Sequence, residues 1–228
     1  MEKRSNIHAG HRQRLDEKVR VMGLDALPQH EQLEYMLYQI IARGDTNGIA
    51  HGLLQKFGSL EQVFNASARE LETVDGVGAR TANFISQIPA IAGIYQRSTV
   101  GDKPILDTTE KLGEYATTLF YGKPIEEVYV ICLTAKRKLT RFQRVSIGGV
   151  SSVPVYVMNL VDSIAASKPH SVVLAHNHPS GEVTPSSDDI ELTKKVADAL
   201  NGMNVNLLDH VIVAGKKYIS MKKSGIIF

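Results

Sequence analysis

Two histidines, a serine and an aspartate lie close together in the C-terminal half of the chain. His176 and His178 stand two positions apart, and Ser186 and Asp189 follow after a short loop. Imidazole nitrogens and a carboxylate oxygen suit Zn²⁺, although Fe²⁺, Mn²⁺ and Ni²⁺ accept the same donors. Three protein ligands leave a fourth coordination position open, which is typical of catalytic rather than structural zinc. The spacing therefore predicts one divalent metal, in the first instance Zn²⁺, bound by His176, His178 and Asp189.

The surrounding sequence predicts a strand, a loop and a helix that bring these three side chains together. Residues 171–175 are an apolar run typical of a buried strand. Alternate residues of an extended segment point to the same side, so both histidines aim at one point beyond the strand. The loop 179–185 contains proline, glycine and serine, which favour a tight turn. A helix expected over 186–200 then places Asp189 in its first turn.

Ser186 and Asp189 also have a purely structural interpretation. A serine followed three residues later by an acid is a common helix-capping pattern, and by itself this pair indicates no more than that. The paired histidines before it favour a metal site. In such a site the Ser186 hydroxyl can donate a hydrogen bond to a developing oxyanion. We therefore predict Ser186 as the oxyanion donor.

These residues resemble the motif of a known metalloprotease superfamily. The pattern His-x-His-Pro-x6-Ser-x2-Asp over 176–189 matches the JAMM (MPN+) motif. The string His-Asn-His-Pro-Ser-Gly over 176–181 looks like the bacterial RadC-like branch of that superfamily. The Leu-Asp-His segment at 208–210 and the paired glycines at 148–149 are similar to further parts of the same branch. Together with the helical N-terminal half, the resemblance covers in effect the whole chain.

The resemblance implies a fold and an activity. The fold is a deaminase-like α/β/α sandwich with a mixed central sheet around a zinc ion. Catalytic members of the superfamily are zinc-dependent isopeptidases that remove ubiquitin-like modifiers, so a peptide or a modified protein is the expected substrate. By this resemblance His176, His178 and Asp189 would be the zinc ligands and Ser186 the oxyanion donor. We therefore expect hydrolysis of peptide or isopeptide bonds by a metal-activated water.

The chain departs from the family at the expected general base. Family members carry an Arg-Glu pair at the start of the helix before the metal strand, and ungapped alignment from His176 puts Met158 and Asn159 there. An amide cannot take the proton of the attacking water, and general-base catalysis typically contributes ~10²–10⁴-fold. Asp162, one turn further along that helix, and Glu182, in the metal loop, are candidate substitutes. The alternative is a catalytically impaired module that binds metal together with DNA or a partner protein.

The first hundred residues predict short helices. Residues 71–88 carry Asp-Gly-Val-Gly between two of them, which resembles a helix-hairpin-helix. Backbone amides in such a turn, at the start of the following helix, contact a phosphate without reading base sequence. The residues that would make this contact are Gly76, Gly78, Arg80 and Thr81. The alternative is that the two glycines only shape a tight turn. Pro89 is expected to end or kink the second helix.

Charge limits the strength of any DNA binding by this half. Residues 1–98 hold eleven basic and eleven acidic residues, and the net charge of the whole chain is +2. Strong non-specific nucleic-acid binders usually carry a clearer basic footprint. We therefore expect at most weak, sequence-independent contact between the N-terminal half and DNA.

A polar stretch at 98–104, punctuated by glycine and proline, predicts the domain boundary. We expect a helical, helix-hairpin-helix-like domain over 1–98. Over 105–228, strands interleaved with helices predict an α/β domain that contains the metal site.

Composition and cysteine content indicate where the protein works. The chain of 228 residues is 43% hydrophobic, with no apolar run long enough to span a bilayer. The N-terminal residues lack a secretory pattern. The single cysteine, Cys132, cannot form an internal disulfide, which fits a reducing compartment. We therefore expect a cytoplasmic protein that does not use a membrane.

Overall fold

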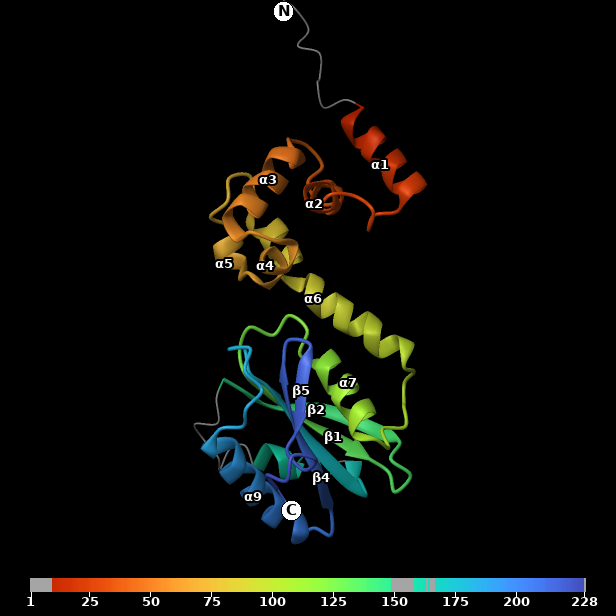
Figure 1. Ribbon diagram of the computed structural model, residues 1–228, viewed down its shortest axis with the longest axis vertical. Coiled ribbons are helices and arrows are strands. Elements are labelled where there is room, and N and C mark those ends of the chain that lie inside the picture. Colours follow the sequence, from red (N-terminus) through yellow and green to blue (C-terminus); the bar gives the residue numbers. More distant parts are fainter. Residues whose placement is uncertain (1–9, 149–157, 163, 165–166, 228) are drawn as a thin grey trace, which may run out of the picture. The chain divides into compact units, whose positions relative to one another are not determined.

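The computed structural model describes residues 10–148, 158–162, 164 and 167–227 (Figure 1). The chain divides into two compact units, Met1–Pro89 and Ala90–Phe228, which are called unit 1 and unit 2 below. Among the described residues, the helices lack the combination of length and apolar character that a membrane span requires.

Unit 1 is built from short helices around one apolar core. Its helices are α1 (His11–Met22), α2 (Gln29–Tyr38), α3 (Thr46–Phe57), α4 (Leu60–Asn65), α5 (Ala68–Leu71) and the first half of α6 (Ala79–Thr99). Side chains of Asp45, Ser59 and Ser67 cap the starts of α3, α4 and α5. Each of these accepts a hydrogen bond from a backbone amide that the helix leaves unpaired. The main contributors to the core are Leu33, Leu37, Leu53, Val63, Leu71 and Ile85.

Helix α6 does not end at Pro89. It runs from Ala79 to Thr99 with the proline inside it. A proline within a helix removes one backbone donor, so the carbonyl four residues earlier loses its usual partner. Of the two expected outcomes, an end or a kink at Pro89, the end is wrong, because the helix continues for ten residues beyond the proline.

Unit 2 is an α/β domain around a mixed five-stranded sheet. Its elements are α7 (Thr109–Leu119), β1 (Glu127–Leu133), β2 (Leu139–Ile147), β3 (Ser171–Asn177), α9 (Ser187–Asn201), β4 (Asn206–Ala214) and β5 (Lys217–Ser220). The described residues 158–162 are helical as well. The strand order is β2-β1-β3-β4-β5, in which β3 and β4 pair in parallel and the other pairs are antiparallel. The predicted fold class, a helical N-terminal region followed by an α/β domain with a mixed sheet, is confirmed.

Alternation along β3 assigns its residues to the two faces of the sheet. Val173 and Ala175 belong to a core that includes α7, whereas Val172 and Leu174 belong to a core that includes α9. Helices α7 and α9 lie on opposite sides of the sheet in Figure 1. Because side chains alternate between faces, His176 falls on the face that α9 covers. The fold therefore brings the end of β3 and the start of α9 to one place.

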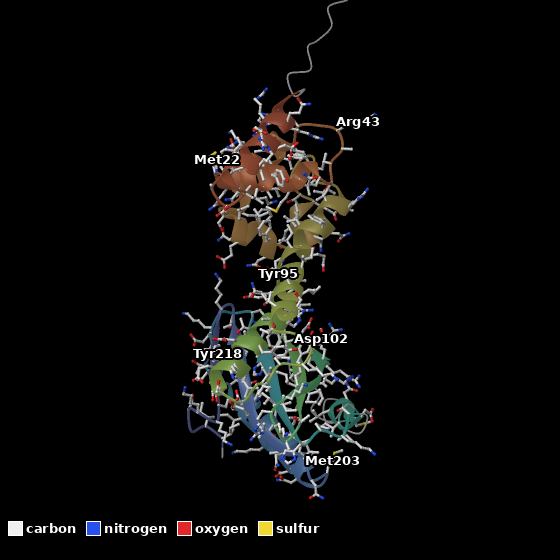
Figure 2. The ribbon with its side chains drawn as sticks, turned by 90° about the vertical axis from the view of Figure 1, so that its right-hand side faces the viewer. Met22, Arg43, Tyr95, Asp102, Met203 and Tyr218 are labelled. Carbon is white, nitrogen blue, oxygen red and sulfur yellow. The ribbon has the colours of Figure 1, made fainter. Side chains whose placement is uncertain are left out.

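On the face of the sheet that α7 covers, an aromatic side chain packs against the helix. The side chain of Tyr218 of β5, labelled in Figure 2, packs against Gly113 of α7. A Cβ added at Gly113 would lie 2.1 Å from an atom of the Tyr218 ring. Glycine at this position therefore lets α7 lie close to the sheet.

Candidate metal centre

Three side chains from two elements form a cluster at the end of β3. The Nε2 atoms of His176 and His178 lie 2.8 Å apart. The Nε2 of His176 lies 3.1 Å from Oδ1 of Asp189, and the Nε2 of His178 lies 3.4 Å from its Oδ2. Within the described part of the chain, this is the group of side chains whose donor atoms, all within 4.8 Å of one another, fit a metal ion.

The donor separations suit a tetrahedral ion. Ligand atoms held about 2.1 Å from zinc at tetrahedral angles are separated by about 3.4 Å. The separations here run from 2.8 to 3.4 Å, so the two imidazoles need to part by roughly half an ångström. Two nitrogens and one carboxylate oxygen are also the donor types that zinc accepts. The residues present therefore fit a Zn²⁺ ion.

Backbone groups hold His178 in place. Its amide donates to the carbonyl oxygen of Val213 in β4 at 2.8 Å, and its ring Nδ1 lies 2.8 Å from the carbonyl oxygen of Glu182. A carbonyl only accepts hydrogen bonds, so the ring proton of His178 is on Nδ1. The lone pair of Nε2 is then directed into the cluster.

A third histidine, which the sequence did not predict as part of the centre, lies behind His176. The Nε2 of His210 in β4 is 2.7 Å from Nδ1 of His176, and its own Nδ1 is 2.6 Å from Oγ1 of Thr193. Burial, together with the neighbouring His176, holds the pKa of His210 well below its usual value. His210 is therefore a neutral partner of one candidate ligand and not a fourth ligand. Its signal in the sequence was the Leu-Asp-His segment at 208–210.

Ser186 and Asp189 form the capping box that their spacing suggests. The amide and the hydroxyl of Ser186 each donate to Oδ2 of Asp189 at 2.7 Å, and the Asp189 amide donates to Ser186 Oγ at 3.1 Å. Burial raises the pKa of the Asp189 carboxyl, but the hydrogen bonds from His176 and Ser186 outweigh it and hold that pKa well below its usual value. Asp189 is thus ionised, with Oδ2 held by Ser186 and Oδ1 directed at His176.

Asn159 is bound to the edge strand of the sheet. Its Nδ2 donates to the carbonyl oxygen of Val145 at 3.1 Å. Val128 pairs with Ser146 and Tyr129 pairs with Arg144, so Val145 is the extra residue of a β-bulge in β2. A bulge leaves such a residue without its ladder partner. The side-chain amide of Asn159 satisfies the carbonyl that the bulge leaves unpaired.

The two candidate substitute bases lie outside the cluster of donors. The carboxylate of Glu182 accepts from the Thr184 hydroxyl at 2.8 Å and from the Thr184 amide at 3.3 Å. These bonds lower the pKa of Glu182, whose side chain is exposed. Asp162 is exposed on the helical segment 158–162. The carboxylate of Glu182 is directed at its own loop, although its backbone carbonyl contacts His178.

Asn177, between the two histidines, points to the opposite face and holds a loop. Its Oδ1 accepts from the amide of Glu127 at 2.8 Å, and its Nδ2 donates to the carbonyl oxygens of Ile125 at 3.2 Å and Lys123 at 3.4 Å. These bonds tie the entry of β1 to the end of β3. The asparagine of the His-Asn-His string is therefore a structural support for the strand that carries both histidines.

Replacing Asn177 with alanine is expected to destabilise unit 2 by about 1–3 kcal/mol, because it leaves the buried amide of Glu127 without its partner. The free energy of unfolding, measured by urea denaturation, checks this. Asn206→Ala is the matched control, since Asn206 is an exposed asparagine in a neighbouring strand. An equal, small effect of both substitutions would contradict the assigned role of Asn177.

The residues predicted to contact a DNA phosphate lie in unit 1. Gly76 has a φ of +85°, a conformation that L side chains rarely adopt, and a Cβ there would lie 2.8 Å from Ile49. Gly78 and Arg80 are exposed near the start of α6. The Thr81 side chain is 6% exposed and belongs to the interior of unit 1. Gly76 therefore has a conformational reason to be glycine, and the phosphate contact stays a prediction.

The fold and the centre define a class of protein: an α/β domain that carries a histidine-histidine-aspartate cluster between the end of a central strand and the start of the following helix. A family model described as the RadC-like JAB domain matches residues 106–226. The chain belongs to this family.

Two curated relatives share almost the whole chain. The UPF0758 protein of Fusobacterium nucleatum subsp. nucleatum is 34% identical over 225 residues, which are 96% of this chain and 97% of the relative. A UPF0758 protein of Rhodobacter capsulatus is 31% identical over 213 residues, which are 93% of this chain and 100% of the relative. Their shared name states no activity. The similarity extends over unit 1 as well as over the JAB domain.

Proposed function

We propose that this chain is a zinc-dependent hydrolase of peptide or isopeptide bonds with slow turnover. The observation that carries the proposal is the buried cluster of His176, His178 and Asp189, whose donor atoms converge with separations of 2.8 to 3.4 Å. These three residues would hold the ion. When bound, Zn²⁺ supplies a Lewis acid and a water of lowered pKa.

Ser186 would act on the substrate rather than on the ion. Its hydroxyl donates to Oδ2 of Asp189, and its backbone amide donates to the same oxygen. If the hydroxyl rotates toward a substrate oxyanion, the amide keeps its bond to Asp189, so the carboxylate stays in place. Loss of one oxyanion donor typically lowers kcat by about 10²–10³-fold. Ser186 can thus have a catalytic role in addition to capping α9.

The slow turnover follows from position 159. A general base must lie within hydrogen-bond reach of the proton that it takes. Asn159 has an amide that is engaged with Val145, and the Glu182 carboxylate is engaged with Thr184. Because these groups are occupied, we expect turnover about 10²–10⁴-fold below that of a site with a positioned carboxylate.

A second candidate function is a non-catalytic, metal-stabilised binding module. The observation in its favour is the hydrogen bond from Asn159 to Val145, which gives the residue at the base position a structural role. Its partner would be a protein, or DNA bound weakly through the turn at 76–81. In either case Cys132 is buried and forms no disulfide. This supports the proposal that the chain works in a reducing compartment, the cytoplasm.

Metal content and peptidase activity, measured on the same purified protein, test the proposal. We expect about one Zn²⁺ per chain by elemental analysis, and slow cleavage of a quenched lysine-linked isopeptide that stops when a chelator removes the ion. Return of activity on adding Zn²⁺ is the control for damage by the chelator. Stoichiometric zinc without cleavage would favour the binding module, and absence of bound metal at saturating Zn²⁺ would refute both candidates.

A further inference from the structure

His176 and His178 are held by chemically different partners. A carbonyl oxygen faces the Nδ1 of His178, and a carbonyl only accepts hydrogen bonds. A second imidazole, that of His210, faces the Nδ1 of His176 at 2.7 Å. A neutral imidazole has one nitrogen that donates and one that accepts, so this contact can run in either direction. His178 has one available tautomer, whereas His176 has two.

The contacts of His210 continue to the third candidate ligand. Its Nδ1 lies 2.6 Å from Oγ1 of Thr193, and that hydroxyl lies 2.5 Å from the carbonyl oxygen of Asp189. The side chains of His210 and Thr193 are 0% exposed, so bulk water cannot replace a bond that is lost. The network thus connects the ring of one ligand to the backbone of another.

We propose that His210 and Thr193 are positioning residues for His176, and that binding of Zn²⁺ reverses the direction of the hydrogen bonds among these three residues. The inference rests on the zinc site proposed above. A zinc ligand must present a lone pair, so His176 must carry its proton on Nδ1 and donate it to His210. His210 then donates from its own Nδ1 to Thr193. The hydroxyl proton of Thr193 goes to the carbonyl oxygen of Asp189.

Removing the ion with a chelator imposes the opposite direction. The Nε2 of His178 presents a lone pair 2.8 Å from the Nε2 of His176, so His176 must then carry its proton on Nε2. Its Nδ1 becomes an acceptor for His210, and His210 in turn accepts from the Thr193 hydroxyl. Two ring protons change nitrogen and one hydroxyl rotates. With one proton on each imidazole, this exchange gains and loses no net proton.

Substitution of Thr193 tests the positioning role with little change of shape. Thr193→Val removes the hydroxyl, and we expect Zn²⁺ affinity to fall by about 10–100-fold, as is usual when a partner of a metal-ligating histidine is lost. Thr193→Ser keeps the hydroxyl and should keep wild-type affinity. Competition with a chromophoric chelator measures both variants. Thermal unfolding in excess chelator verifies that the valine variant is folded.

Substitution of His210 tests its place in the hydrogen-bond network between His176 and Thr193. His210→Gln keeps one acceptor and one donor, because the glutamine amide can accept from His176 and donate to Thr193. His210→Leu has neither, so we expect a larger loss of Zn²⁺ affinity in the leucine variant than in the glutamine variant. Equal affinities of the two variants, or unchanged affinity in Thr193→Val, would overturn the positioning role.

Imidazole ¹⁵N chemical shifts test the reversal directly in the wild-type chain. Those of His210 should indicate a proton on Nε2 in chelator and on Nδ1 after Zn²⁺ is added. The same tautomer in both conditions would overturn the reversal. If the wild type binds no Zn²⁺ at all, the proposed zinc site is refuted. The affinity titration of the wild type distinguishes that outcome from failure of the proposed reversal.

Discussion

Replacing His178 with alanine is expected to weaken Zn²⁺ binding by more than about 100-fold, because loss of a residue that merely orients a ligand already costs about 10–100-fold. His178 suits this test better than its neighbour. Its side chain is 15% exposed, whereas that of His176 is 1% exposed and bonded to His210. Truncation at 178 therefore removes a donor with little damage to the interior. Competition with a chromophoric chelator gives the affinity.

His170→Ala is the matched control for this substitution. His170 is an exposed histidine directly before the opposite end of β3, and its described hydrogen bonds use the backbone. The control should bind Zn²⁺ like the wild type. A ligand that binds the folded chain raises its melting temperature, so Zn²⁺ should raise that of the wild type and the control but not that of His178→Ala. Wild-type affinity in His178→Ala would contradict the assignment of the centre.

The meeting of the three side chains could be predicted because it is local in sequence. The two histidines share one strand, and alternation places them on one side. Asp189 follows after a single loop and falls in the first turn of α9, where its capping box with Ser186 fixes it. These relations depend on strand period and helix capping, both of which single sequences encode well. The α/β class of unit 2 followed from the order of apolar runs, whereas the mixed sheet was what the family resemblance implied.

His210 and Thr193 could not be assigned in this way, because their positions depend on long-range pairing. His210 comes 34 residues after His176 and reaches it through the parallel register of β3 and β4, in which it pairs with Leu174. A shift of this register by one residue would turn His210 to the opposite face. Thr193 lies one helical turn after Asp189, but its contact with His210 depends on where β4 pairs in the sheet.

The contact between Asn159 and Val145 depends on a β-bulge, which no local sequence pattern predicts. Val145 needs a side-chain donor because β2 has one more residue than its partner strand at this point. Bulges of this kind arise from the pairing of two strands and the helix above them. The sequence therefore indicated what Asn159 lacks, a carboxylate, but not what its amide does.

Replacing Asn159 with glutamate is expected to raise kcat for an isopeptide substrate by about 10²–10⁴-fold, the usual contribution of a positioned general base. Val128 of β1 pairs with both Ser146 of β2 and His176 of β3. The bulge at Val145 thus lies about two strand spacings, roughly 10 Å, from His176 across the sheet. The side chains of Val145 and Leu160 share the core that α9 covers, so Asn159 is attached next to the face that carries His176. By the family resemblance, position 159 is where family members carry the general-base glutamate, and this is why a carboxylate there is expected to serve the centre.

The same substitution should cost stability. A carboxylate cannot donate a hydrogen bond, so the carbonyl oxygen of Val145 would lose its partner. An unsatisfied buried group costs about 1–3 kcal/mol, and Val145 is 4% exposed. We therefore expect a faster but less stable enzyme. Urea unfolding and steady-state kinetics on one preparation measure the two effects together.

Asn159→Gln separates the two contributions, because glutamine has the length of glutamate but no basic oxygen. It should show no gain in kcat, so a gain confined to Asn159→Glu assigns the effect to the carboxylate rather than to side-chain length. If the wild type already turns over as fast as Asn159→Glu, the base is elsewhere, and Asp162→Asn and Glu182→Gln then identify which acid supplies it. Equal, negligible activity of the wild type and of both residue-159 variants in zinc-loaded protein would refute a hydrolytic site that lacks only its base.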